Sequence, residues 1–536
     1  MSENLSGRDR AATLMSTGGD TAVLDRLPLL GRGGASSRRQ WGSIAGWATN
    51  AVGLLALFTV LVGVSAVVLF ASAGSHALVP RGRAFPLWEA GPLHSLLSQP
   101  IWPRMRVARR YSELMGALTV AYALAMLAGR RLPMKVIGGF VVLASLILLL
   151  GPPLPLNDVF NYLGYSRLAG VHGLSPYTHV MFDERHDPVY QLASWRNLSS
   201  PYGPLFTTLT IPLSWLPLPT AYWVLKVAIV ALSFGFIWLV ARVAVRLDQD
   251  PRLPVLFVAA NPIYLFYEVG GFHNDFLMLV PSMAAIGLML ARRERTSGAV
   301  LMLAVAVKFT TVVLLPFMLV AAHTRERRLR VLAGAALAVL PLAVLSISLF
   351  GTGLPNVADQ SRLVTGYSVP NLAGLLLGIG GSTSTLMRAA DVCVVLVVLW
   401  GIRQRDWIAS AGWATVALIA SIAWLMPWYI VWALPLAAVT RSRALRAVVL
   451  AFSVFLLASF LPTTDQFMRA HHFDPMASRV DRAAVAFQQR LERAPGRGRR
   501  PSLCQNLERC SVCLRSEAPT AWNATTSSRF CRLLAS

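Results

Sequence analysis

The residue best placed to do chemistry is Asp158, which lies just past the end of a long apolar run, Val136 to Leu150. A carboxylate at the mouth of a membrane helix costs free energy unless it pairs, faces water or takes part in a reaction. Asp158 is therefore a candidate general base that removes the proton of an acceptor hydroxyl. The alternative is a structural acid that caps its helix or pairs with Arg167. The stretch around it, residues 152–204, is rich in Tyr, Trp, His, Arg and Pro, which predicts a folded, substrate-binding outer loop.

A second polar cluster, His273-Asn274-Asp275, stands between two apolar runs. Three polar groups at such a place are costly unless they are satisfied, so they are candidates to bind sugar hydroxyls or a cation. The structural alternative is a helix N-cap ahead of Phe276.

Lys308 lies inside another apolar run. It either extends to the membrane interface or reaches an anionic phosphate.

Two aromatic residues, Trp428 and Tyr429, form a third candidate group at the end of an apolar run. Aromatic side chains at a helix end commonly belong to the interface belt, and they can also stack on a sugar or an isoprenoid.

The carboxylates and Asn274 could hold a divalent cation, but a lysine could supply the same charge. We therefore assign no metal ligand and no certain cofactor.

The elements that must position these residues are membrane helices. The chain has 536 residues, of which 55% are hydrophobic and 14% charged, whereas soluble domains carry about 25% charged residues. Apolar runs of roughly 20 residues recur, long enough to cross a bilayer. They are continuous rather than alternating, which argues against a β-barrel. The sequence predicts an all-α polytopic integral membrane protein.

The net charge of +24 does not indicate a nucleic-acid partner, because the basic residues cluster in short loops between apolar runs, as the positive-inside rule expects. The sequence also contains no P-loop, no GxGxxG after a strand, no HExxH and no GxSxG. No soluble region is large enough to bind a nucleotide. An energy-rich substrate should therefore reach the site from the membrane.

The same charge pattern predicts the topology. Arg38 and Arg39 place the N-terminus in the cytoplasm, and the three polar or aromatic clusters then fall together on the outer side of the plasma membrane. One run, residues 297–322, has basic residues on both flanks. A single crossing would put the second basic flank on the outer side. A hairpin of two short helices, with Lys308 at its tip, keeps both basic flanks in the cytoplasm. Broken helices are tolerated where they line a cavity.

Composition divides the chain into three regions. Residues 1–42 are polar and predict a disordered cytoplasmic segment. Residues 43–462 form the transmembrane catalytic domain. Residues 463–536 are basic and contain Cys504, Cys510, Cys513 and Cys531, whose spacing completes no zinc site. The predicted topology places this basic tail on the outer side, which the positive-inside rule disfavours. Either a further reversal exists or the tail is not a native continuation, as after a shifted reading frame, and we assign it no role.

Several short motifs occur in a characteristic order: Asn157-Asp158-Val159-Phe160-Asn161-Tyr162-Leu163, His172-Gly173-Leu174-Ser175-Pro176-Tyr177, Ser200-Pro201-Tyr202-Gly203-Pro204, Asn261-Pro262, Gly270-Gly271-Phe272-His273-Asn274-Asp275, Ala306-Val307-Lys308-Phe309-Thr310 and Pro427-Trp428-Tyr429. This set resembles actinobacterial polyprenol-phosphate-mannose-dependent mannosyltransferases of the GT-C superfamily, of the lipomannan-core alpha-1,6 type. The resemblance covers residues 150–461 and not the tail. It implies a bundle of about 11 to 13 transmembrane helices with re-entrant segments and an outer-face loop.

The resemblance also implies a reaction. An inverting glycosyltransferase would move mannose from a polyprenyl-phosphate donor to a lipid-linked glycan acceptor on the outer face, with Asp158 as base and membrane lipids around it. The expected donor-binding residues are Lys308, His273, Asn274, Asp275 and Arg167. The expected acceptor-binding or sugar-binding residues are Tyr162, Tyr177, Tyr202, Trp428 and Tyr429. The alternative is a flippase or transporter that moves a lipid-linked glycan without forming a bond.

Overall fold

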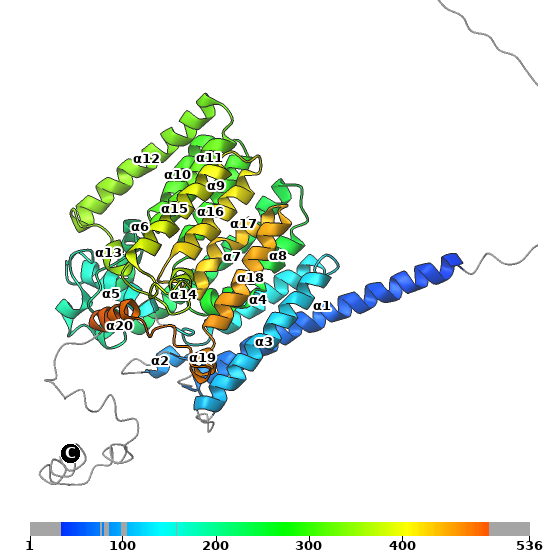
Figure 1. Cartoon of the computed structure of the whole chain (residues 1–536), viewed down its shortest axis with the longest axis horizontal. Coiled ribbons are helices and arrows are strands. Elements are labelled where there is room, and N and C mark those ends of the chain that lie inside the picture. Colours follow the sequence, from blue (N-terminus) through cyan, green and yellow to red (C-terminus); the bar gives the residue numbers. More distant parts are fainter. Residues whose placement is uncertain (1–33, 75–77, 80–84, 98–103, 157, 493–536) are drawn as a thin grey trace, which may run out of the picture.

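The computed structural model describes residues 34–74, 78–79, 85–97, 104–156 and 158–492. Within these residues all regular structure is helical, which confirms the predicted all-α class (Figure 1). Residues 1–33, Asn157 and the cysteines at positions 504, 510, 513 and 531 lie outside the described residues.

The α-helices are α1 (Gly34–Ser72), α2 (Leu87–Ala90), α3 (Arg104–Ala128), α4 (Met134–Leu149), α5 (Asp158–Gly170), α6 (Pro204–Thr210), α7 (Leu218–Arg246), α8 (Arg252–Ala259), α9 (Phe276–Leu290), α10 (Glu294–Val305), α11 (Leu315–Ala321), α12 (Arg325–Phe350), α13 (Val357–Gln360), α14 (Val369–Leu376), α15 (Ser384–Gly401), α16 (Trp407–Ser421), α17 (Leu434–Val439), α18 (Arg443–Ser459), α19 (Thr464–Ala470) and α20 (Arg479–Glu492). The 3-10 helices are η1 (Met181–Glu184), η2 (Pro188–Gln191), η3 (Ile211–Trp215), η5 (Phe309–Leu314) and η6 (Pro427–Trp432), and η4 (Tyr264–Val269) is a π-helix.

Several of these helices suit a bilayer. By length and composition, five helices in the described part of the chain, α1, α3, α7, α12 and α15, can cross a membrane, and α18 with α19, which are bent by 76°, can form a sixth span. Shorter apolar helices, among them α4, α9 and α16, pack against them. The protein is therefore a helical membrane protein, while the larger number of spans implied by the resemblance stays a prediction.

The predicted hairpin around Lys308 is confirmed. α10 ends at Val305, Lys308 has extended backbone angles (φ −143°, ψ 119°), and η5 and α11 return the chain to the start of α12. At that start, Arg327 of α12 donates to Glu294 of α10 at 2.6 Å. The basic flanks before and after the hairpin therefore meet at one end of the bundle.

The bundle thus has a basic end and a loop end. α9 runs from Asp275 at the loop end toward the basic turn that follows it, where Arg246 donates to the carbonyl of Gly287 at 2.8 Å. Figure 1 shows α5, α13 and α20 gathered at the loop end. The polar clusters singled out in the sequence therefore share one end, as the charge pattern predicted.

The last described helix, α20, packs against the loop of residues 152–204. Phe487 and Leu491 form a small apolar cluster with Leu198 and Leu363. The backbone N–H of Asn197 donates to the carbonyl of Leu491 at 2.9 Å. Part of the region after residue 462 therefore packs against the domain that carries Asp158.

Candidate active site

Asp158 is the first residue of α5, and its carboxylate faces the loop before α9. Its Oδ2 lies 3.6 Å from Nδ1 of His273, and its side chain is 15% exposed. Its Oδ1 accepts a hydrogen bond from Nδ2 of Asn161 at 3.3 Å. Burial raises the pKa of Asp158 to about 6, while the charge of Lys308 acts in the opposite direction. A carboxyl group that titrates close to neutral pH suits a general base.

The two loops that carry Asp158 and His273 are tied together. The N–H of Leu154 donates to the carbonyl of Gly270 at 2.9 Å. The buried ammonium of Lys226 on α7 donates to the carbonyl of Gly151 at 2.6 Å and lies 4.5 Å from the centre of the Phe272 ring. These contacts fix the separation between the candidate base and its histidine.

The loop before α9 carries three fully buried polar residues, His273, Asn274 and Asp275. The N–H of Asn274 donates to the hydroxyl of Tyr162 at 3.3 Å, and that hydroxyl lies 3.4 Å from Nδ1 of His273. Burial, followed by the charge of Lys308, lowers the pKa of His273 well below its usual range, so its ring is neutral. Phe272 has a positive φ of 52°. Such a backbone is costly for a bulky residue and is typical of functional loops.

Each of these three residues has a buried polar atom without a partner in the described part of the chain: Nε2 of His273, Nδ2 of Asn274 and Oδ2 of Asp275. Buried polar atoms are rarely left without hydrogen bonds. The side chain of Asp275 also makes no capping hydrogen bond to α9. The cap alternative is therefore not what holds Asp275, and these three atoms keep unused hydrogen-bonding capacity.

Asp275 is held by a cation and an indole. Lys308 donates to its Oδ1 at 2.7 Å, and Nε1 of Trp432 donates to the same atom at 2.5 Å. The Lys308 side chain is 15% exposed, whereas that of Asp275 is fully buried. The hairpin tip thus delivers a positive charge beside the candidate base, and Lys308 does not simply extend to the interface.

The turn Ser200–Pro204 is fitted against this hairpin tip. The N–H of Gly203 donates to the carbonyl of Val307 at 2.9 Å, and the N–H of Leu205 donates to that of Ala306 at 3.1 Å. A Cβ on Gly203 would lie 2.2 Å from the carbonyl oxygen of Ala306. Only glycine permits this approach, which explains why the turn needs Gly203.

The aromatic residues of η6 complete the cluster. Trp428 stacks on His273, with ring centroids 3.8 Å apart and planes 14° apart, and Tyr429 stacks on Trp432 at 4.6 Å. Trp428 is 4% exposed and Tyr429 is 8% exposed. Both therefore lie inside the site and not in an interface belt.

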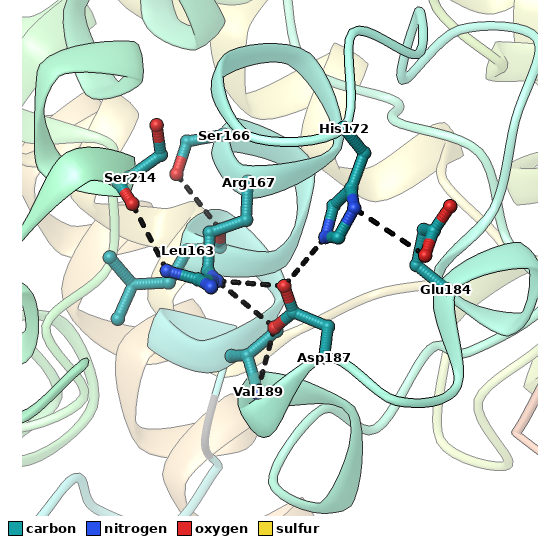
Figure 2. A network of polar contacts seen from close by, with 8 residues as sticks. All are labelled: Leu163, Ser166, Arg167, His172, Glu184, Asp187, Val189 and Ser214. Carbon is teal, nitrogen blue, oxygen red and sulfur yellow. Dashed lines mark hydrogen bonds and ion pairs between the residues drawn. The ribbon is translucent and has the colours of Figure 1, made fainter. Parts of the chain in front are cut away.

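Arg167 is not brought to this cluster by any described contact. Figure 2 shows Arg167 and His172 converging on the carboxylate of Asp187. The Arg167 guanidinium is 2.9 Å from Asp187 and also donates to the carbonyl of Ser214 at 3.0 Å. Glu184 lies 3.4 Å from the other nitrogen of His172. Arg167 therefore does not pair with Asp158, and its predicted role in donor binding stays a prediction.

The three tyrosines predicted to contact the acceptor pack into the loop end. Tyr162 and Tyr202 meet edge to face at 5.1 Å. The hydroxyl of Tyr177 lies 3.1 Å from Oγ1 of Thr207, and its ring contacts Phe350 at 5.3 Å. Tyr162 is 1% exposed and Tyr177 is 5% exposed. Their predicted role in acceptor binding stays a prediction.

Three residues of this region were not predicted from the sequence. Lys226 is a lysine inside an apolar run, the same signal that singled out Lys308. Glu268 is fully buried, and neither carboxylate oxygen has a partner among the described residues. It stands at the end of an apolar run, the signal that singled out Asp158. Trp432 has no such signal, because a tryptophan among apolar residues is commonly core.

Among the described residues of the range 34–492, no group of three His, Cys, Asp or Glu side chains is placed to hold a metal ion. The positive charge beside Asp275 comes from the Lys308 ammonium.

Comparison with known sequences decides the family. A family described as alpha-(1->6)-mannopyranosyltransferase, N-terminal domain, matches residues 51–324. This range contains Asp158, the loop before α9 and Lys308. The chain belongs to this family of mannosyltransferases. A second family, glycosyltransferase family 87, matches residues 201–460, which adds η6 with Trp428 and Trp432. The chain is thus a glycosyltransferase, as the resemblance implied.

The relatives of this mannosyltransferase carry the same description. Alpha-(1->6)-mannopyranosyltransferase A of Mycobacterium tuberculosis is 25% identical over 59% of this chain and 67% of its own length. The protein of the same name from Corynebacterium glutamicum is 29% identical over 32% of this chain and 35% of its own length. A probable alpha-(1->6)-mannopyranosyltransferase of Mycolicibacterium smegmatis is 26% identical over 65% of this chain and 74% of its own length. No solved structure matches.

Proposed function

We propose that this mannosyltransferase moves mannose from a polyprenyl-phosphate donor to a hydroxyl of a lipid-linked glycan acceptor, with inversion, at the outer face of the plasma membrane. The observation that carries the proposal is the convergence of Asp158, neutral His273 and the Asp275–Lys308 pair around buried polar atoms that have no described protein partner. Three separate loops supply these groups to one end of the bundle.

The roles follow from the chemistry of each group. The acceptor oxygen attacks the anomeric carbon, and Asp158 takes the hydroxyl proton. The bond between that carbon and the phosphate oxygen breaks, and the lipid phosphate leaves with the electron pair. Lys308 offers its charge to this developing phosphate. The unpartnered atoms of His273, Asn274 and Asp275 bind donor oxygens and hydroxyls.

A lipid donor suits the surroundings of Lys308. A narrow apolar crevice lies between α9, η5 and α16, lined among others by Met278, Thr310, Leu418 and Trp432. It shares Trp432 with the polar cluster, and Thr310 is two residues from Lys308. An apolar chain attached to a phosphate at Lys308 would find an apolar surface here to pack against. The basic turns lie at the opposite end of the bundle, which supports an outer position of the site by the positive-inside rule.

The test uses purified protein in liposomes with labelled polyprenyl-phosphate mannose and an α-(1→6)-linked mannan oligosaccharide. We expect label in the oligosaccharide with the wild type and a loss of roughly 100- to 10,000-fold with Asp158→Asn. The matched control is Asp183→Asn, an exposed acid of the same loop that accepts a hydrogen bond from Val180. Movement of the labelled lipid across the bilayer without a new glycosidic bond would instead favour the transporter alternative.

A further inference from the structure

A tryptophan that the reaction above does not use lies beside the candidate base. Burial is the largest influence on the pKa of the Asp158 carboxyl and raises it, whereas the Trp195 side chain acts to lower it. Its backbone N–H donates to Oδ1 of Asn161 at 3.0 Å, and Nδ2 of the same Asn161 donates to Asp158. The Trp195 backbone is therefore on the side of Asp158 that Asn161 occupies, whereas the other carboxylate oxygen lies 3.6 Å from Nδ1 of His273.

A second tryptophan, Trp424, completes a pair. The rings of Trp195 and Trp424 meet edge to face, with centroids 5.7 Å apart and planes at 82°. Both are half-buried, so each keeps part of its surface open, unlike Trp428 and Trp432. One side of the pair packs on the apolar cluster that contains Phe487 of α20.

The segment that carries Trp424 also reaches the donor side. Four residues later Trp428 stacks on His273. Thr365 clamps the intervening backbone, since its Oγ1 accepts from the N–H of Leu425 at 3.2 Å and its N–H donates to the carbonyl of Ala423 at 2.9 Å. This clamped segment thus carries one ring against Trp195, whose backbone is tied to Asn161, and another ring against His273, which lies beside Asp158.

We propose that Trp195 and Trp424, the tryptophan pair, form the subsite that binds the terminal sugar of the glycan acceptor. A pyranose presents an apolar C–H face and a rim of hydroxyls. A half-exposed indole offers an apolar face with an N–H at its edge, and rigid aromatic surfaces of this kind bind ligands at low entropic cost. The acceptor hydroxyl then lies beside Asp158, and the donor occupies the side of His273 and Lys308.

The pair could instead serve only to support the loop, and kinetics separate the two roles. The inference rests on the proposed glycosyl transfer. We expect Trp424→Ala to raise the KM for an α-(1→6)-linked mannotrioside by roughly three- to tenfold, with the KM for the lipid donor unchanged. Trp424→Phe should restore most of the acceptor affinity. The matched control is Trp215→Ala, an exposed tryptophan of η3 whose Nε1 donates to Gly170.

Equilibrium dialysis of labelled mannotrioside against the wild type, Trp424→Ala and Trp424→Phe measures binding without turnover. Weaker binding in Trp424→Ala, recovered in Trp424→Phe, supports the tryptophan pair even if no transfer is found, in which case the proposed function fails alone. Transfer with an unchanged acceptor KM and unchanged binding would overturn the pair and leave the proposed function standing. Donor and acceptor KM values that rise together would show a supporting role only, and would also overturn it.

Discussion

Asp158 and Lys308 show how single residues acquire a role from their surroundings. A carboxylate that is 15% exposed and faces a neutral histidine at 3.6 Å differs from a surface acid. The ammonium of Lys308 is bound to Asp275 and not to Asp158, so Asp158 stays available as a base. Asp158 and Asp275 thus have different neighbours. Asp275 binds the Lys308 ammonium, whereas Asp158 lies beside a neutral histidine and can accept a proton.

The first prediction at this scale concerns pH. Because burial raises the pKa of Asp158 to about 6, its basic form is lost as the pH falls through that value. The kcat/KM for transfer should therefore rise with pH through about 6 and level off above it. A pH–rate profile of the purified protein checks this. A profile that stays flat from about pH 5 to about pH 8 would contradict the assignment.

The second prediction concerns the charge at the hairpin tip. Lys308→Met removes the ammonium beside Asp275, so kcat/KM for the lipid donor should fall roughly 10- to 100-fold. Lys308→Arg keeps the charge and should retain more activity. Lys135→Met is the matched control, because Lys135 is an exposed lysine near the start of α4. Equal activity of Lys308→Met and Lys135→Met would remove Lys308 from the site.

At the scale of elements, the site depends on breaks in helices. The hairpin of α10, η5 and α11 presents Lys308 in an extended backbone, and the π-helical η4 leads into the loop with the positive φ at Phe272. The charge pattern predicted the hairpin because a single crossing would have placed one basic flank on the wrong side. It gave no sign of the docking of Ser200–Pro204 on the hairpin tip, which depends on a tertiary contact of backbone groups.

That docking predicts opposite effects at two glycines. Gly203→Ala should lower both the melting temperature and the transfer rate, because its Cβ would lie 2.2 Å from the Ala306 carbonyl oxygen. Gly138→Ala, within α4, should leave the melting temperature unchanged or raise it, since nothing lies within 4 Å of its Cβ and alanine favours a helix by about 1 kcal/mol. Thermal unfolding and the transfer assay measure both. Equal melting temperatures would contradict the close fit.

At the scale of the whole molecule, the sequence predicted the helical membrane class and the meeting of Asp158 with His273. Charged and polar residues in apolar runs are costly, so their positions are informative. Contacts made by ordinary residue types were not predictable. Trp428 has the signature of an interface belt yet stacks on His273. Arg167 finds its partner in Asp187, twenty residues away in an irregular loop.

The packing of helix α20 was also not predicted, because its region carried no assigned role. Phe487 is 8% exposed, packs with Leu198 and lies 4.0 Å below the Arg362 guanidinium. Phe487→Ala should therefore destabilise the packing of α20 on the loop of residues 152–204 by about 3 kcal/mol. Limited proteolysis of the loop checks this. Phe467→Ala on α19 is the control, since Phe467 is 62% exposed. Equal proteolysis of both variants would contradict the packing of α20 against the loop.

The role of Asp158 in taking the acceptor proton can be measured by the single-turnover rate of mannose transfer from a pre-bound lipid donor at saturating acceptor. We predict a rate at least about 100-fold lower for Asp158→Asn than for the wild type, with donor binding retained, and no such loss for Asp183→Asn. A rate for Asp158→Asn within about twofold of the wild type would contradict the account.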